Sequence, residues 1–135
     1  MTETFVITSE SKNLKPLRHR VRRLIQKSGL LPRDMSHVLM AISEVCSNSI
    51  RHSYEGISGK KIRVRIKDQR NKIEIRVRDY GKKIDFSKVK MPVLPPTKPH
   101  GLGIYFLKTT MDYVRFNTRH ARGTEVILIK LKRGF

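Results

Sequence analysis

Apolar and polar residues alternate strictly in two neighbouring segments, Lys61–Asp68 and Lys72–Arg78. A period of two residues predicts β-strands that bury one face. The short polar segment between them, residues 69–71, predicts that the two strands form a hairpin. Three further strands are expected, over Thr4–Thr8, Tyr113–Asn117 and Glu125–Leu131.

Three other segments have apolar residues spaced three and four apart, which predicts helices. They are Leu14–Lys27, Asp34 to about Tyr54, and Leu102–Met111, with a turn at Leu31-Pro32 before the second. Together these elements predict an α/β fold, a two-layer sandwich in which a mixed, mostly antiparallel sheet carries helices on one face. With 135 residues and 38% hydrophobic content, residues 1–135 are expected to form a single domain.

The chain is strongly basic, with 30 Lys and Arg residues against 11 Asp and Glu residues and a formal net charge of +19. Five basic residues occupy polar positions of the two alternating strands: Arg63, Arg65, Lys67, Arg76 and Arg78. We expect them to face away from the core, with only Glu74 to offset their charge. Such a surface is either solvated or binds an acidic protein or nucleic-acid phosphates. Nucleic acid is the less favoured partner because no aromatic residue interleaves with these arginines.

The chain lacks the features of a membrane or disulfide-stabilised protein. No apolar run approaches the roughly 18 residues that a membrane-spanning helix needs. Cys46 is the only cysteine, so it cannot form an internal disulfide, and its apolar neighbours predict a buried, unreactive thiol. We therefore expect a soluble, cytoplasmic protein without a membrane partner.

Three polar residues of the second predicted helix, Glu44, Asn48 and His52, are spaced four apart and are expected to share one helix face. A carboxylate beside an amide oxygen suits a hydrated divalent cation. Magnesium keeps several of its waters, so Asn48 and substrate phosphates are enough to hold it, which leaves Glu44 free to act as a base. For His52 we favour a structural or capping role. The simpler alternative is that all three form the solvent-exposed side of an amphipathic helix.

Four short motifs follow one another in a fixed order. They are the stretch from Glu44 to Tyr54, Asp79-Tyr80-Gly81, His100-Gly101-Leu102-Gly103, and Arg122-Gly123-Thr124. In this order the chain resembles, from about Phe5 to Leu131, the ATP-binding superfamily of gyrase, the heat-shock chaperone, histidine kinases and mismatch-repair ATPases. Its small size and the first motif are most similar to the RsbW-like branch of bacterial anti-sigma factors and serine-protein kinases. The resemblance implies the histidine-kinase-like ATPase fold.

The resemblance also implies roles around an adenine base. Asp79 matches the aspartate that accepts a hydrogen bond from the adenine amino group, and Thr124 matches the threonine that supports this aspartate and the base through a water. Gly81 would let the backbone approach the base without a Cβ in the way. The alternative interpretation of Asp79-Tyr80-Gly81 is an ordinary surface turn.

A second group of residues is expected near the phosphates. Gly101, Leu102 and Gly103 open the third predicted helix, where free N–H groups donate hydrogen bonds to phosphate oxygens. Residues 87–100 are Pro-rich and resemble a short ATP lid, from which Lys98 would reach a terminal phosphate. Lys83 stands where the family usually has the second glycine of its D-x-G-x-G motif. This lysine either points at the phosphates or narrows the pocket and weakens nucleotide binding.

The activity implied by the resemblance requires ATP and Mg²⁺, with Asn48 as metal ligand and Glu44 positioning or deprotonating a substrate serine. The expected protein is an ATP-binding anti-sigma regulatory factor with serine/threonine-protein kinase activity. Its expected partners are a sigma factor and a small antagonist protein that it phosphorylates, and the family pattern implies a homodimer. Two alternatives are a non-catalytic adaptor whose shape responds to ATP and, less favoured, a basic nucleic-acid-binding domain.

Overall fold

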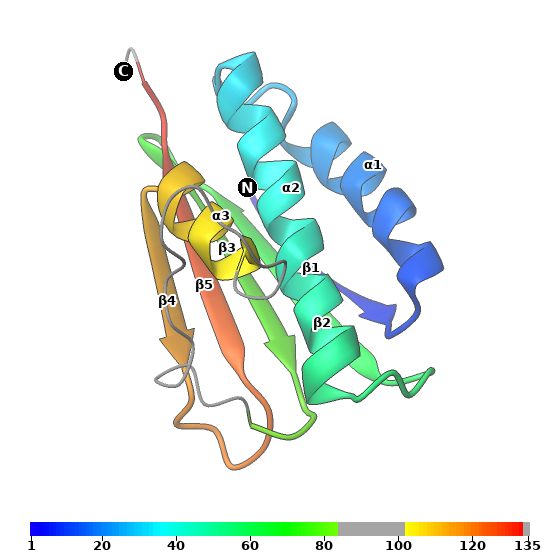
Figure 1. Cartoon of the computed structure of the whole chain (residues 1–135). Helices are drawn as coiled ribbons and strands as arrows, with labels where there is room; N and C mark the ends of the chain where they lie inside the picture. The colour runs from blue at the N-terminus through cyan, green and yellow to red at the C-terminus, as the bar shows by residue number, and fades with distance from the viewer. Residues whose placement is uncertain (84–101, 134–135) are drawn as a thin grey trace.

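The computed structural model describes residues 1–83 and 102–133 (Figure 1). The elements in chain order are β1 (Thr2–Thr8), a 3-10 turn (Ser11–Asn13), α1 (Leu14–Ile25), α2 (Pro32–Asn48), a π-helical turn (Ser49–Ser53), β2 (Lys61–Asp68), β3 (Lys72–Asp79), α3 (Leu102–Thr110), β4 (Tyr113–Asn117) and β5 (Glu125–Leu131). The predicted Pro-rich lid, residues 87–100, lies outside the described ranges.

The five strands form one sheet in the order β1-β2-β3-β5-β4, and all four strand pairings are antiparallel. The three helices lie on the same face of this sheet, so the described residues form two layers (Figure 1). This confirms the predicted α/β sandwich with helices on one face, but the pairings among the described strands are all antiparallel rather than mixed. None of the helices in the described ranges is both long enough and apolar enough to span a membrane.

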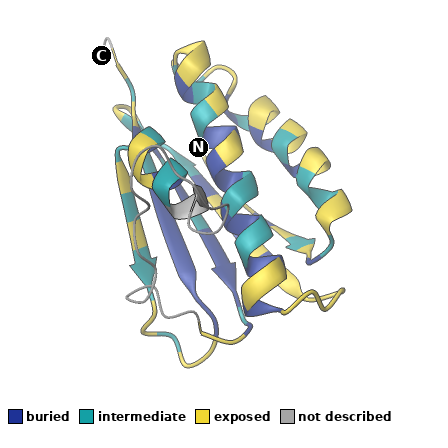
Figure 2. Cartoon of the chain, viewed as in Figure 1, coloured by how far each residue is buried: buried dark blue, intermediate teal, exposed yellow. Residues whose placement is uncertain are grey.

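The core lies between α2 and the two alternating strands. Their apolar positions are fully buried: Ile62, Val64 and Ile66 of β2 and Ile73, Ile75 and Val77 of β3. They face a stripe of α2 formed by Val38, Ile42, Val45 and Cys46. Figure 2 shows the buried central strands beneath α2 and the exposed outer side of α1. The period-two pattern therefore placed these six strand side chains correctly.

The helix predicted from Asp34 to about Tyr54 differs from the observed one at both ends. It begins two residues earlier, because Pro32 occupies the first helical turn, where its fixed φ and missing N–H carry no cost. At Ser49 the hydrogen bonding changes from α to π, and the Tyr54 N–H donates to the Ser49 carbonyl at 2.9 Å. Single-turn π segments of this kind often lie at functional sites.

The open face of the sheet is less uniformly basic than predicted. Arg63 and Arg65 are exposed, but Arg78 is buried and donates to the carbonyl oxygens of Asp79 and Arg122. Its expected solvent-facing position is therefore wrong, because the last residue of β3 and the loop before β5 supply acceptors for its guanidinium.

Arg76 is neutralised by two carboxylates, whereas the sequence predicted that only Glu74 would offset the charge. It lies 3.4 Å from Glu74 and 3.6 Å from Glu125. Glu125 belongs to β5, which pairs with β3. The strand order was not predicted, so this second carboxylate was missed.

A buried ion pair links the first turn of α2 to the end of β5. Asp34 is 1% exposed and lies 3.5 Å from the Lys130 ammonium group, which is itself buried and also donates to the Thr110 carbonyl oxygen. Arg133 approaches the other Asp34 oxygen at 3.4 Å. A buried carboxylate is tolerated only with such partners, so these contacts fix the start of α2 on the sheet.

Candidate nucleotide-binding site

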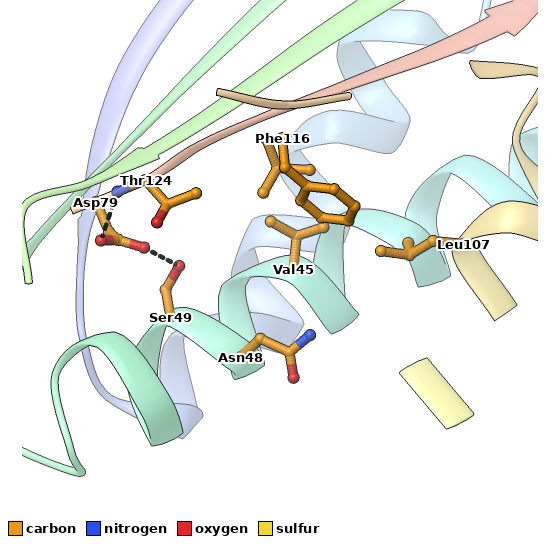
Figure 3. A pocket seen from close by; sticks show the side chains of 8 residues that line it. Val45, Asn48, Ser49, Asp79, Leu107, Phe116 and Thr124 are labelled. Carbon is orange, nitrogen blue, oxygen red and sulfur yellow. Dashed lines mark hydrogen bonds between the residues drawn. The ribbon is translucent and has the colours of Figure 1, made fainter. Parts of the chain in front are cut away.

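The candidate site is built around Asp79, the last residue of β3, which is 3% exposed. The Ser49 hydroxyl donates a 2.8 Å hydrogen bond to one carboxylate oxygen of Asp79. The backbone N–H groups of Gly81 and Thr124 donate to the other oxygen at 3.2 and 3.3 Å. Figure 3 shows the bonds from Ser49 and Thr124. Three donors from three segments therefore hold the carboxylate in one orientation. Each carboxylate oxygen has two lone pairs, so the oxygen that accepts only from Ser49 still has capacity for a further donor.

The approach of β5 to Asp79 depends on Gly123. This residue has a φ of +71°, and a Cβ at this position would overlap the carbonyl group of Asp79. Only glycine fits without strain, and its conformation brings the next residue, Thr124, against Asp79. The Thr124 hydroxyl oxygen is buried and has no hydrogen-bond partner among the described residues. An unpaired buried hydroxyl favours a ligand or a water beside it.

Apolar side chains surround this polar corner. The residues that line the pocket are Val45, Asn48, Ser49, Asp79, Leu107, Phe116, Thr124 and Val126. Its cavity volume is about 10 Å³, roughly enough for one water molecule. Figure 3 shows Val45, Leu107 and Phe116 on one side of the pocket and the Asp79 carboxylate on the other. Apolar walls with a few fixed polar groups are typical of sites for small organic ligands.

Gly81 also has a packing role that the sequence did not predict, and its expected role toward the base stays a prediction. A Cβ here would overlap the carbonyl oxygen of Ser53 and lie 2.9 Å from the Tyr54 ring. The glycine therefore permits close packing of the loop on the π-helical turn. The same turn holds this loop by two further bonds, from the Lys82 N–H to Ser53 at 2.9 Å and from the Tyr80 N–H to the Tyr54 hydroxyl at 2.7 Å.

Two titratable groups next to Asp79 are held in their neutral forms. Burial raises the pKa of the Cys46 thiol to about 12, and the Asp79 charge adds to this effect. Burial also raises the pKa of the Tyr54 hydroxyl, which donates to the Lys61 carbonyl oxygen. Cys46 is thus the unreactive buried thiol that its apolar neighbours predicted.

The predicted metal-site residues lie at the end of α2, and Arg51 joins them. The guanidinium of Arg51 donates to the Asn48 side-chain oxygen at 3.0 Å and lies 3.6 Å from the Glu44 carboxylate. Spacings of four and seven residues put Glu44, Asn48 and Arg51 on one stripe of the helix. Thus Arg51 contacts both predicted residues, whereas the side chain of His52 is exposed.

The remaining predicted positions fall at or beyond the edges of the described ranges. Lys83 is exposed and is the last described residue before the gap. Lys98 and Gly101 lie outside the described residues. Leu102 and Gly103 begin α3, which places a helix N-terminus at this point of the chain as predicted.

The sequence interpretation missed Ser49 and Arg51 as site residues. Ser49 follows Val38, Ile42 and Val45 at helical spacing, and the presence of a polar residue in this otherwise apolar series was the available signal. Arg51 is one residue before His52, and the four-residue spacing directed attention to the histidine. The change to π-helical hydrogen bonding at Ser49 has no clear sequence signal.

A fixed carboxylate acceptor at the end of a central strand, with an unpaired hydroxyl and apolar walls beside it, is the arrangement expected of an α/β protein that binds a nucleotide base. The chain matches the family of the histidine kinase-like ATPase domain over residues 7–130, and it belongs to that family.

Curated relatives agree with this assignment. The serine-protein kinase RsbW of Bacillus velezensis is 28% identical over 109 residues, which cover 75% of this chain and 67% of the relative. RsbW of Bacillus pumilus is 31% identical and covers 65% and 60%, respectively. RsbW of Bacillus cereus is 29% identical over 132 residues, covering 92% and 81%. These similarities confirm the predicted resemblance to the RsbW-like branch.

A solved structure shares the fold. The crystal structure of the RsbU and RsbW domains of Rv1364c from Mycobacterium tuberculosis superposes with a TM-score of 0.71 at 18% sequence identity. The superposition covers 98% of this chain but 33% of that chain, so this protein corresponds to about a third of its length. At this identity the comparison supports the fold alone.

Proposed function

We propose that this protein binds ATP with Mg²⁺ and acts as an anti-sigma regulatory factor that phosphorylates a serine or threonine of a small antagonist protein. The observation that carries the proposal is the buried Asp79 carboxylate, held by Ser49, Gly81 and Thr124 at the wall of an apolar pocket. Membership in the ATPase family and the names of the RsbW relatives support it.

The pocket suits adenine rather than guanine. A carboxylate can only accept hydrogen bonds, so Asp79 pairs with the amino group of adenine and is repelled by the carbonyl oxygen that guanine carries there. The buried Thr124 hydroxyl supplies a second polar contact, directly or through a water. Val45, Leu107 and Phe116 provide the apolar surface for the flat ring.

The end of α2 suits the phosphates and their metal ion. The Asn48 oxygen is a hard ligand of the kind that Mg²⁺ prefers, and Glu44 lies one turn earlier, within reach of an acceptor hydroxyl. When bound, ATP would supply the phosphoryl group, and the Mg²⁺ held by Asn48 would neutralise part of the charge on that group. Glu44 orients the acceptor hydroxyl and receives its proton.

Several parts of the proposal rest on the resemblance. They are the phosphate contacts of Lys83, Lys98, Gly101, Leu102 and Gly103, a lid over residues 87–100, and a single domain over residues 1–135. A sigma factor as partner, a homodimer and a cytoplasmic location belong to the same group. The exposed arginines of β2 favour an acidic surface on a protein partner.

Binding and catalysis are tested separately. Calorimetric titration with Mg-ATP should show binding to the wild type, and Asp79→Asn should weaken it by about ten- to hundredfold because one buried hydrogen bond to the base is lost. Mg-GTP is the matched ligand control and should bind weakly. Equal binding of ATP and GTP, or no effect of Asp79→Asn, would remove the adenine assignment.

The kinase activity is tested by transfer of labelled γ-phosphate to the antagonist protein. Glu44→Ala should abolish most of this transfer while it leaves ATP binding in place, because general-base catalysis contributes about 10²–10⁴-fold. If Glu44→Ala transfers phosphate as the wild type does, the protein is the ATP-responsive adaptor rather than a kinase.

A further inference from the structure

Arg51 occupies the position beside Glu44 and Asn48 where the proposed function requires a metal ion. One nitrogen of its guanidinium, Nη2, makes both contacts, at 3.0 Å to Asn48 and 3.6 Å to Glu44. A guanidinium is a permanent cation with N–H donors and no acceptor. It therefore satisfies the same two oxygens that a hydrated magnesium ion would satisfy.

We propose that Arg51 is a positioning residue that holds the side-chain oxygens of Glu44 and Asn48 while no metal is bound, and that Mg²⁺ must displace its guanidinium to coordinate Asn48. The inference rests on the proposed function, since it concerns the metal ion that accompanies the nucleotide.

The short distances involved argue that the Arg51 guanidinium and Mg²⁺ do not share the Asn48 oxygen. Magnesium binds an oxygen ligand at about 2.0–2.1 Å. A metal on the Asn48 oxygen would thus lie within about 5 Å of the guanidinium nitrogen, which is 3.0 Å from the same oxygen. Like charges at this separation repel each other, so the arginine leaves as the metal arrives.

The structure allows this exchange at low cost. The Arg51 side chain is 57% exposed and the Glu44 side chain 29% exposed, so their ion pair is open to water. Exposed ion pairs contribute little to stability, and a solvated guanidinium can move away without being buried elsewhere. Arg51 therefore orients the side-chain oxygens of Glu44 and Asn48 through contacts that are easily broken.

The other described basic groups near this end of α2 do not compete for this role. Lys82, on the loop after β3, lies 3.7 Å from the Glu55 carboxylate. His52, the residue after Arg51, has an exposed side chain. Arg51 alone among the described basic residues contacts both Glu44 and Asn48.

The test is the Mg²⁺ dependence of nucleotide affinity, measured by calorimetry with a non-hydrolysable ATP analogue in EDTA and at graded Mg²⁺ concentrations. Arg51→Gln should lower the Mg²⁺ concentration that gives half of the effect by about three- to tenfold, since the competing cation is gone. Affinity in EDTA should change less than twofold. Arg51→Lys, which keeps the charge without the planar fork, should be intermediate.

Arg22→Gln is the matched control, because Arg22 is an exposed arginine of α1 and its loss changes the net charge equally. It should leave the Mg²⁺ dependence unchanged. An unchanged or higher Mg²⁺ requirement in Arg51→Gln would overturn the inference. Equal weakening with and without Mg²⁺ would also overturn it, since Arg51 would then be a phosphate ligand. If the wild type binds the nucleotide under neither condition, the proposed function and this inference both fail.

Discussion

The hydrogen bond from Ser49 to Asp79 makes a testable contribution to stability. Both residues are buried, and the hydroxyl donates to a charged acceptor at 2.8 Å. Hydrogen bonds to charged groups contribute about 1.5–3 kcal/mol, and the loss of this one leaves a buried carboxylate oxygen without its donor. Ser49→Ala should therefore lower the free energy of unfolding of the nucleotide-free protein by about 1.5–3 kcal/mol.

The assay is urea unfolding at pH 7, followed by circular dichroism. The expected loss corresponds to a fall of roughly 1 M in the urea midpoint and of about 5–10 °C in the melting temperature. Ser47→Ala is the control, because Ser47 lies on the same helix and its hydroxyl has no hydrogen-bond partner among the described residues. A Ser49→Ala variant within about 0.5 kcal/mol of the wild type would refute the reasoning, since ordinary surface substitutions have effects of that size.

Two further predictions concern other parts of the molecule. Gly123→Ala should destabilise the protein by at least about 2 kcal/mol in the same urea assay, because a Cβ would overlap the Asp79 carbonyl and the residue would also keep a positive φ. The control is Gly59→Ala, which is also at positive φ but in open space and should cost about 1 kcal/mol. For His37, burial and then the Lys130 charge lower the pKa below its ordinary value of 6.5. Between the folded pKa and 6.5 the unfolded chain binds the proton and the folded chain does not, so stability falls as the pH drops through this window. Unfolding measured between pH 7.5 and pH 5.5 should show a smaller loss in His37→Gln than in the wild type, and equal losses would contradict the assignment.

The fold was largely predictable because the buried face of each helix or strand places apolar residues at the period of that element in the sequence. Lys61–Asp68 and Lys72–Asp79 alternate because each strand has one face against α2, and the apolar stripe of α2 recurs because it packs on those strands. Element boundaries were less predictable. A proline such as Pro32 is equally compatible with the first turn of a helix and with a turn that precedes the helix, and only the folded structure distinguishes these two positions.

The site was predictable where a residue type is required by its chemistry. Asp79, Asn48 and Thr124, named from the sequence, line one pocket in the structure, and their roles toward a nucleotide stay predictions. Arg78 was not predictable because its burial depends on carbonyl groups of Asp79 and Arg122, which lie 1 and 44 residues away along the chain.

The position of Arg51 was not predictable for a local reason. Its contacts depend on side-chain rotamers at the junction of an α-helix and a π-helical turn, and a polar residue at any of several neighbouring positions would fit the same sequence pattern.

The two buried acidic residues have a joint consequence for α2. Asp34 ties the first turn of the helix to Lys130 on β5, and Ser49 ties its far end to Asp79 on β3. The two attachments are 15 residues apart in sequence, a span of about 22 Å along a helix axis. Because it is attached near both ends, this helix cannot slide or rotate on the sheet without breaking one of the two buried contacts. Any shape change that a ligand transmits to a partner must therefore travel through other segments, while α2 serves as the fixed reference against which they move.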